Sequence, residues 1–376
     1  MGFLLALSCA LILYGTLHPF SFTFGSREES ILSLLAASTH SYVGRGDTIA
    51  NVILFLPFGF FAMQSVFQRA PRPIRLIFIV VSGAALSFGI ECAQSCLPGR
   101  SVSIYDLLTN TTGALLGAVL GWKDWRGKLP KLRADNHPPA IFPVLLLGAW
   151  LGGKLFPFVP ALKTQNIKNA LKPLFFGEFV LSDALWSFIA AMVVCRLAQA
   201  FVRPGRLQTA LTFLPLGVIA VKPFILGGSI LRAEILGALL GIAAWRYMLS
   251  RIRRNAGILA LLLMAQIVIQ GLAPFVFIPF TGLFSIIPFG GFLRGITAGN
   301  VLQFTEKVFF YGAFLWLLIK TGLSLRFSVI FSVALLAGIE IMQMFISGGV
   351  AEITNPLLAV ILGLFLYFLD LRDESP

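Results

Sequence analysis

Residues 76–96 read LIFIVVSGAALSFGIECAQSC, and Glu91 is the one charged side chain among them. At a rise of about 1.5 Å per residue, an apolar helix of this length matches the roughly 30 Å hydrocarbon core of a bilayer. Inside lipid the backbone N–H and C=O groups must be satisfied within the segment, which favours a helix. The basic residues Arg69, Arg72 and Arg75 precede it. The stretch therefore predicts a transmembrane helix that carries one buried acid.

The whole chain has the same apolar character. Its 376 residues are 57% hydrophobic and 12% charged, with a mean hydropathy of +0.89. Soluble domains average about 45–50% apolar and about 25% charged residues. This composition excludes soluble enzymes and nucleic-acid binders and predicts an all-α, polytopic membrane protein.

Twelve apolar runs are long enough to be read as spans. We predict helices over 3–16, 49–67, 76–96, 107–121, 141–159, 184–201, 207–225, 230–249, 258–275, 301–319, 327–346 and 356–369. In the long loop after the first span, residues 31–37 are interpreted either as an amphipathic helix on the membrane surface or as a linker. No convincing strand is predicted.

The net charge of +13 is explained by topology. Lys and Arg cluster in alternate connections, as cytoplasmic loops require, which places both termini in the cytoplasm. Basic residues near the membrane surface attract anionic lipid. Membrane lipids are therefore the expected partners, and a nucleic-acid partner is not expected.

Three sequence markers recur at thirds of the chain. Leu-x-Pro-Phe ends a helix at 17–20, 155–158 and 272–275, and a Gly-containing hairpin precedes a small-residue helix three times. Gly-Ile-Glu-x-x-Gln occurs at 89–94 and 338–343. We therefore predict three parallel four-helix repeats, over 1–135, 136–255 and 256–376. A rival division into two units of six helices resembles common secondary transporters.

Polar residues of the first repeat are expected to converge near the outer surface. Glu91 and Gln94 share a face of one helix, Asp106 and Asn110 share a face of the next, and a short hairpin joins the two. An ionised group in the membrane costs at least ~2.5–3.5 kcal/mol, so intramembrane acids are functional by default. The predicted ligand-binding cluster comprises Asn51, Glu91, Gln94, Arg100, Asp106 and Asn110. The alternative is that these groups only hold helices together.

Two features of the first repeat are interpreted as structural. Gly113 and Gly117, four residues apart, let helices approach closely. Pro57 with Gly59 is interpreted as a helix kink or an unwound segment.

The first repeat resembles a known family through its motifs ANVILFLPFGFF, GIECAQSCLPGR and SIYDLLTNTTGALLG. These are similar to the VanZ-like family, named for a teicoplanin-resistance protein, over about residues 14–122, and the other two repeats look like diverged copies. The resemblance implies an integral protein of the bacterial cytoplasmic membrane linked to the cell envelope and to antibiotic resistance. It implies no settled biochemical activity.

The third repeat holds a second candidate site, altered from the first. It comprises Asn300, Glu306, Lys307, Glu340, Gln343, Glu352 and Asn355. A constant offset of 249 places Asn355 on Asp106. A one-residue deletion places it on Asn110, and we prefer that pairing. Lys307 with Glu340 is a candidate replacement for Arg100 with Glu91. The second repeat carries Glu234 at the position of Asn110, with Asp183, Lys222 and Arg232 near the outer edge.

No pattern in the chain indicates a cofactor or a metal. Three scattered His and four Cys have no zinc-ligand spacing, and no Gly-rich phosphate loop follows a strand. The preferred function is a non-enzymatic protein whose outward polar pocket binds a cell-envelope component such as a lipid-linked or glycan precursor. A proton-coupled secondary transporter and a membrane enzyme acting on a lipid headgroup remain alternatives.

Overall fold

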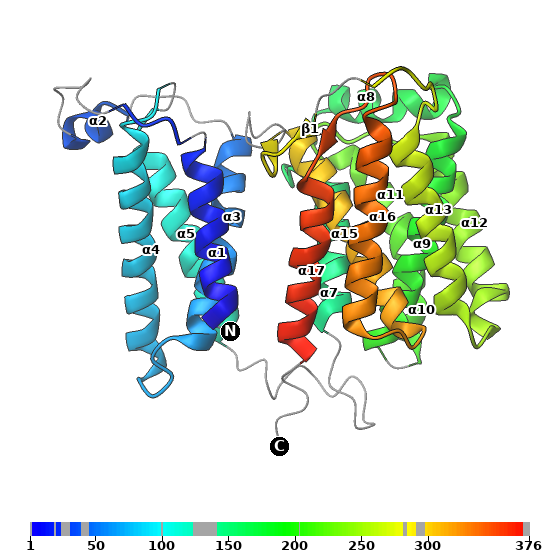
Figure 1. The fold of residues 1–376 in the computed structure, drawn as a ribbon, viewed down its shortest axis with the longest axis horizontal. Helices are drawn as coiled ribbons and strands as arrows, with labels where there is room; N and C mark the ends of the chain where they lie inside the picture. The colour runs from blue at the N-terminus through cyan, green and yellow to red at the C-terminus, as the bar shows by residue number, and fades with distance from the viewer. Residues whose placement is uncertain are drawn as a thin grey trace. The chain divides into compact units, whose positions relative to one another are not determined.

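The protein forms two compact units, residues 1–130 and 131–376, each described by itself (Figure 1). The computed structural model describes residues 2–18, 20–23, 31–38, 45–98, 101–122, 141–202, 204–280, 284–290 and 298–370. It is 77% helical and nearly all-α, which confirms the all-α character that the composition predicts.

The described residues of the first unit form four long helices and one short one. They are α1 (Gly2–Leu17), α2 (Ile31–Ala37), α3 (Arg45–Ser65), α4 (Arg72–Gln94) and α5 (Ile104–Trp122). The four long helices cover the predicted spans, and α2 occupies the run for which a helix or a linker was expected. The core lies between the long helices around Ile12, Phe55, Ile90 and Ala114.

Helices α3 and α5 pack backbone to backbone. A Cβ added at Gly113 would lie 2.4 Å from the carbonyl oxygen of Val52, and one at Gly117 would lie 2.0 Å from that of Leu56. Only glycine fits such an approach, as predicted for this pair. Gly59 serves the same contact from α3, where its Cβ would meet the Ala114 carbonyl oxygen at 2.0 Å. Helix α3 is continuous through Pro57, so this segment is not unwound.

The second unit contains the remaining helices and one minimal sheet. Its elements are α7 (Ile141–Leu155), α8 (Thr164–Phe176), α9 (Leu181–Phe201), α10 (Arg206–Thr212), α11 (Leu214–Val221), η2 (Lys222–Phe224), α12 (Arg232–Tyr247), η3 (Leu249–Arg251), α13 (Asn255–Leu272), β1 (Phe284–Ser285), α15 (Ala298–Lys320), α16 (Leu325–Gln343), β2 (Ala351–Glu352) and α17 (Thr354–Asp370). Its core combines residues from the predicted second and third repeats, such as Met192, Leu263 and Phe309.

Three local features of the second unit differ from expectation. The single helix expected over 207–225 is wrong, because α10 and α11 meet at a bend of 54° where Pro215 occupies the first turn of α11. Helix α8 was not predicted as a helix. Two-residue strands β1 and β2 pair in parallel, with Phe284 opposite Ala351 and Ser285 opposite Glu352, and so short a pair leaves no alternating pattern in the sequence.

Membrane crossing is supported for part of the chain. Within the described residues, five helices are long and apolar enough to cross a membrane, or six if the bent α10–α11 pair is one span. Four further apolar helices are shorter. The count of twelve crossings stays a prediction.

The Leu-x-Pro-Phe marker adopts one backbone conformation wherever it occurs. Phe20, Phe158 and Phe275 have φ angles of 61°, 60° and 62°, a left-handed region that bulky residues rarely occupy. Each donates its N–H to the carbonyl of the leucine three residues earlier, at 2.8, 2.8 and 2.9 Å. The marker therefore encodes the same chain reversal three times.

Candidate functional site

Glu91 lies at the end of α4, facing the start of α5. Its side chain is 1% exposed, and its Oε2 accepts a hydrogen bond of 2.8 Å from the backbone N–H of Ser103. The hydroxyl of Ser103 in turn accepts a bond of 3.4 Å from the N–H of Asp106. The short connection between the two helices thus brings the acid of α4 to the first turn of α5.

Asn51 of α3 completes this group. Its Nδ2 donates to Oδ1 of Asp106 at 2.9 Å, and Asp106 interacts electrostatically with Glu91. Asn51 therefore contacts Asp106 directly, and Glu91 and Asp106 are connected through Ser103. Ser103 links them but was missed, because a serine in a hairpin carries no distinctive signal.

The residue after helix α2 contacts the start of α5. The hydroxyl of Ser38, directly after α2, accepts the backbone N–H of Ile104 at 2.9 Å. Ser38 is 7% exposed. The end of α2 is therefore held beside the first residue of α5.

Gln94 and Asn110 make separate contacts. Gln94 Nε2 donates to the carbonyl oxygen of Thr16 in α1 at 2.9 Å, and Asn110 Nδ2 donates to the hydroxyl of Ser87 in α4 at 3.0 Å. Each bond joins two helices, which is the structural alternative considered for the cluster. The Oδ1 atom of Asn110 is buried and has no hydrogen-bond partner among the residues that the structure describes.

Arg100, the expected cation of the cluster, lies outside the described residues. Glu91 forms no ion pair with any residue that the structure describes. A buried carboxylate that is compensated by one amide donor is costly in an apolar environment, so a further donor or cation is needed at this position.

In the predicted third repeat, Glu340 accepts hydrogen bonds much as Glu91 does in the first. Its Oε2 accepts the N–H of Glu352 at 2.6 Å, its Oε1 accepts from Asn355 Nδ2, and it interacts electrostatically with Lys307. Glu352 also accepts the hydroxyl of Thr354 at 2.7 Å. Glu340, Glu352 and Asn355 of the second candidate site therefore lie together, and Lys307 acts on Glu340 electrostatically.

Two other members of that site, Glu306 and Gln343, make contacts elsewhere. Glu306 accepts the indole N–H of Trp186 in α9, because adjacent residues of a helix point about 100° apart. Gln343 donates to the carbonyl oxygen of Gly271 at 2.8 Å, which parallels Gln94. Asn300 makes an interaction of its own.

These bonds define how the first and third repeats correspond. Glu91 and Glu340 each accept the backbone N–H of the residue twelve positions later. These matching bonds pair Ser103 with Glu352 and so favour the constant offset of 249 over the preferred one-residue deletion at this point. The pairing of Asn355 with Asp106 or with Asn110 stays a prediction.

The predicted second repeat contains an ionic triad around the buried Glu234. Glu234 is 6% exposed and pairs with Lys222 at 2.6 Å and with Lys154 at 3.5 Å. Arg232 donates to the carbonyl oxygen of Gly177. Lys154 was missed, although a lysine in an otherwise apolar helix is a signal of function or of a buried partner.

Within the described residues, no group of three or more His, Cys, Asp or Glu is placed to hold a metal ion. The four cysteines, Cys9, Cys92, Cys96 and Cys195, are free. The chemistry at hand is therefore that of carboxylates, amides and ammonium groups.

Comparison with known proteins identifies the first unit. The VanZ/LLP1 family matches residues 4–123, which include Asn51, Glu91 and Asp106 and extend the predicted match of about 14–122. No curated protein and no solved structure matches the chain. Together with the apolar helices, this match shows that the chain is a membrane protein carrying one VanZ-like domain at residues 4–123.

Proposed function

We propose that the VanZ-like unit binds a cell-envelope component, a lipid-linked or glycan precursor, through Asn51, Glu91 and Asp106. The observation that carries this proposal is the Glu91 carboxylate. It is 1% exposed, it has one backbone donor at 2.8 Å, and it lies near a second carboxylate. Such a group is unfavourable in a membrane unless another donor neutralises it.

The chemistry of the cluster suits a hydroxyl-rich or amine-bearing ligand. Two carboxylates accept charge-assisted hydrogen bonds, which are stronger than neutral ones in a poorly hydrated site. The amide of Asn51 is already committed to Asp106 at 2.9 Å, which holds that carboxylate in place. Arg100, next to this group in sequence, is the chain's own cation for the site. The link to the envelope and to glycopeptide susceptibility comes from the family.

The proposal includes an orientation. We place both termini in the cytoplasm of a bacterial cytoplasmic membrane, with twelve spans in three parallel repeats, so that the cluster faces outward. The common backbone turn at Phe20, Phe158 and Phe275 supports three repeats. The matching bonds of Glu91 and Glu340 support the pairing of the first and third.

The test is Glu91→Gln and Arg100→Ala in cells whose teicoplanin susceptibility depends on this protein. Both variants should abolish the protection while expression level and thermal unfolding in detergent stay near those of the wild type. Glu178→Gln, which removes an exposed acid of the second unit, is the matched control and should protect normally. Loss of folding in Glu91→Gln would show that the cluster only holds helices together.

One observation favours a second function, proton-coupled secondary transport. Glu340 and Lys307 lie near each other inside helices that qualify as spans, and such intramembrane charges are typical of proton relays. Solute flux driven by a proton gradient in reconstituted vesicles, lost in Glu340→Gln, would support transport. Turnover of a lipid by the purified protein, lost in Glu91→Gln and Asp106→Asn, would instead favour a membrane enzyme.

A further inference from the structure

Helix α8 is too short and too polar to be a span. Its 13 residues, TQNIKNALKPLFF, extend about 20 Å at a rise of about 1.5 Å per residue, against roughly 30 Å of hydrocarbon. It lies across one end of the helices of the second unit (Figure 1). None of its residues belongs to the polar clusters described above. The helix therefore needs its own explanation.

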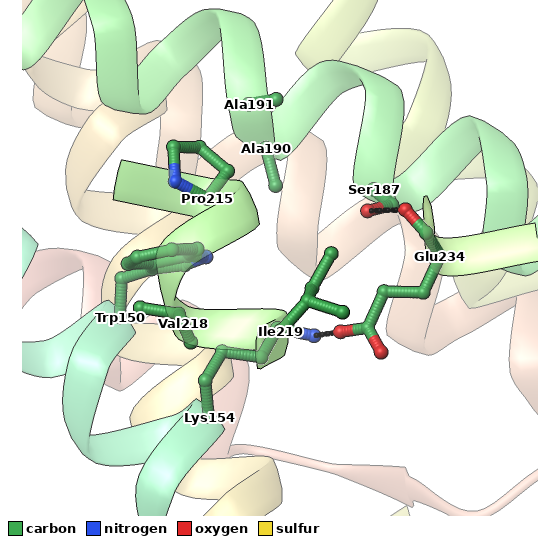
Figure 2. A pocket seen from close by; sticks show the side chains of 9 residues that line it. All are labelled: Trp150, Lys154, Ser187, Ala190, Ala191, Pro215, Val218, Ile219 and Glu234. Atoms are coloured by element: carbon green, nitrogen blue, oxygen red, sulfur yellow. Dashed lines mark hydrogen bonds and ion pairs between the residues drawn. The ribbon is translucent and has the colours of Figure 1, made fainter. Parts of the chain in front are cut away.

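One face of α8 is fixed to the unit. Ala170 is 4% exposed, and its carbonyl oxygen accepts the backbone N–H of Ile230 at 3.0 Å. Leu174 packs against a hydrophobic cluster that includes Ile219, a residue that also lines the small cavity beside Glu234 (Figure 2). The helix is therefore held in place, and its opposite face points away from the unit.

This opposite face carries lysines beside phenylalanines. Lys168 and Lys172 are four residues apart, so they share a face of the helix, and both are exposed. Phe175 and Phe176 follow one turn later and are 66% and 81% exposed. Such a combination is typical of a helix in the headgroup region of a bilayer, where the rings enter the acyl boundary and the ammonium groups stay among the headgroups.

The lysines give this connection an unbalanced charge. Residues 160–182 hold Lys163, Lys168 and Lys172 against one acid, Glu178, and the three lysines form no ion pair with any residue that the structure describes. The positive-inside rule does not explain them, because in the predicted topology this connection lies opposite the basic ones. The matching connection of the first repeat, residues 21–48, holds two arginines against three acids. The excess is therefore particular to the second repeat and calls for an anionic partner.

The position of α8 along the chain identifies that partner. Only four residues, 177–180, separate α8 from α9, which is long and apolar enough to cross a membrane. The end of α8 that carries Phe175 and Phe176 therefore lies near the level at which α9 enters the bilayer. A free anion would make no use of these exposed rings, whereas a bilayer offers both an apolar boundary and phosphate groups. The anionic partner that fits both features is a phospholipid.

We propose that the outward face of α8 binds the phosphate headgroups of anionic phospholipids. Lys168 and Lys172 are the cationic groups, and Phe175 and Phe176 anchor the helix in the acyl boundary. Each lysine near an anionic surface strengthens such binding roughly fivefold. The face is an open surface, so a headgroup needs no cavity. The inference concerns the second repeat and does not depend on the ligand proposed for the first unit.

The first test measures how fast each lysine of the full-length protein is acylated in nanodiscs, with a membrane-impermeant amine reagent and mass spectrometry. The discs contain phosphatidylcholine alone or mixed equally with phosphatidylglycerol, in both leaflets, so the result does not depend on orientation. Lys168 and Lys172 should react roughly fivefold more slowly with phosphatidylglycerol present, because anionic headgroups cover the ammonium groups and keep them protonated. Sodium chloride at about 1 M, where charges are screened beyond about 3 Å, should remove the difference.

The second test uses variants and measures how much more phosphatidylglycerol stabilises the protein against heat than phosphatidylcholine does. Lys168→Gln combined with Lys172→Gln should reduce this difference, and arginine at both positions should retain it because the charge is kept. Gln165→Ala combined with Asn169→Ala is the matched control. These exposed, uncharged residues of the same helix bond to each other at 3.0 Å, and their loss should leave the difference between the two lipids unchanged.

Three results would overturn the proposal. The first is equal acylation of Lys168 and Lys172 in both kinds of disc, which would mean that no anionic lipid reaches them. The second is an undiminished effect of phosphatidylglycerol in the double glutamine variant. The third is an equal slowing by inorganic phosphate in phosphatidylcholine discs at matched ionic strength, which would indicate a free-anion site.

Discussion

Gly117→Ala tests the contact that holds the VanZ-like unit together. The new methyl group would lie 2.0 Å from the carbonyl oxygen of Leu56 and 2.9 Å from the backbone nitrogen of Phe60. Because real Cβ atoms essentially never approach within 3.0 Å, α5 must move away from α3 by about 1 Å. The obstacle is backbone, which cannot rotate aside as a side chain can.

The magnitude follows from the packing that this movement disturbs. Phe55 of α3 and Ala114 and Ala118 of α5 are 0% exposed. A gap of about 1 Å removes roughly a quarter to a half of each dispersion contact, and overpacking of this kind costs about 1–3 kcal/mol. For a unit of this size each kcal/mol lowers Tm by roughly 4 °C. We therefore expect a decrease of about 4–12 °C.

The assay is thermal unfolding of the purified protein in detergent, followed by fluorescence or by size-exclusion chromatography after heating. Gly89→Ala is the matched control, since it makes the same change in α4 with no atom within 4 Å of the new methyl group. It should be neutral or stabilise by up to about 1 kcal/mol, because alanine is the better helix former. Equal Tm values for the two variants would refute the reasoning that backbone contact at Gly117 limits the packing.

Three further predictions concern the polar groups of the two units. Glu234→Gln leaves Lys222 and Lys154 without their carboxylate and should destabilise the second unit by about 3–5 kcal/mol. Thermal unfolding measures this loss, with Glu178→Gln as the exposed control. An unchanged Tm would show that the triad is solvated. Gln94→Ala removes the bond to the Thr16 carbonyl and should lower the free energy of unfolding by only about 0.6 kcal/mol, the average for such bonds in membranes. A decrease above about 2 kcal/mol in chemical unfolding would give Gln94 a larger role. Asn51→Ala releases Asp106 and should lower protection against teicoplanin severalfold without loss of folded protein, so an unchanged susceptibility would remove Asn51 from the proposed site.

Much of the fold could be predicted from local composition. Long apolar runs must become helices in a membrane because no water is present to pair their backbone groups, and helices occupy each predicted segment. The spacing of Gly113 and Gly117 likewise predicted a close approach, since four-residue spacing places both on one helix face. The break at Pro215 and the helix α8 were missed, because both depend on how the end of the second unit packs.

The candidate site was predictable only in part. The sequence by itself determined that Glu91 and Asp106 lie at facing helix ends, because a short hairpin leaves them no other arrangement. It did not determine that Gln94 and Asn110 turn to other helices, nor that Asn355 donates a hydrogen bond to Glu340. Those outcomes depend on which carbonyl or hydroxyl is within hydrogen-bonding reach.

The ionic triad shows most clearly what tertiary structure adds to the sequence. The sequence places Lys154, Lys222 and Glu234 in three separate segments, with Lys222 and Glu234 both near the outer edge, and does not determine that the three meet. Tertiary structure brings them together because, inside an apolar unit, a charge is tolerated only beside an opposite charge, and the packing of α7, α12 and η2 determines which charges can reach one another. Helix formation is a local consequence of excluding water from the backbone, whereas the pairing of buried charges is decided by the arrangement of the whole unit.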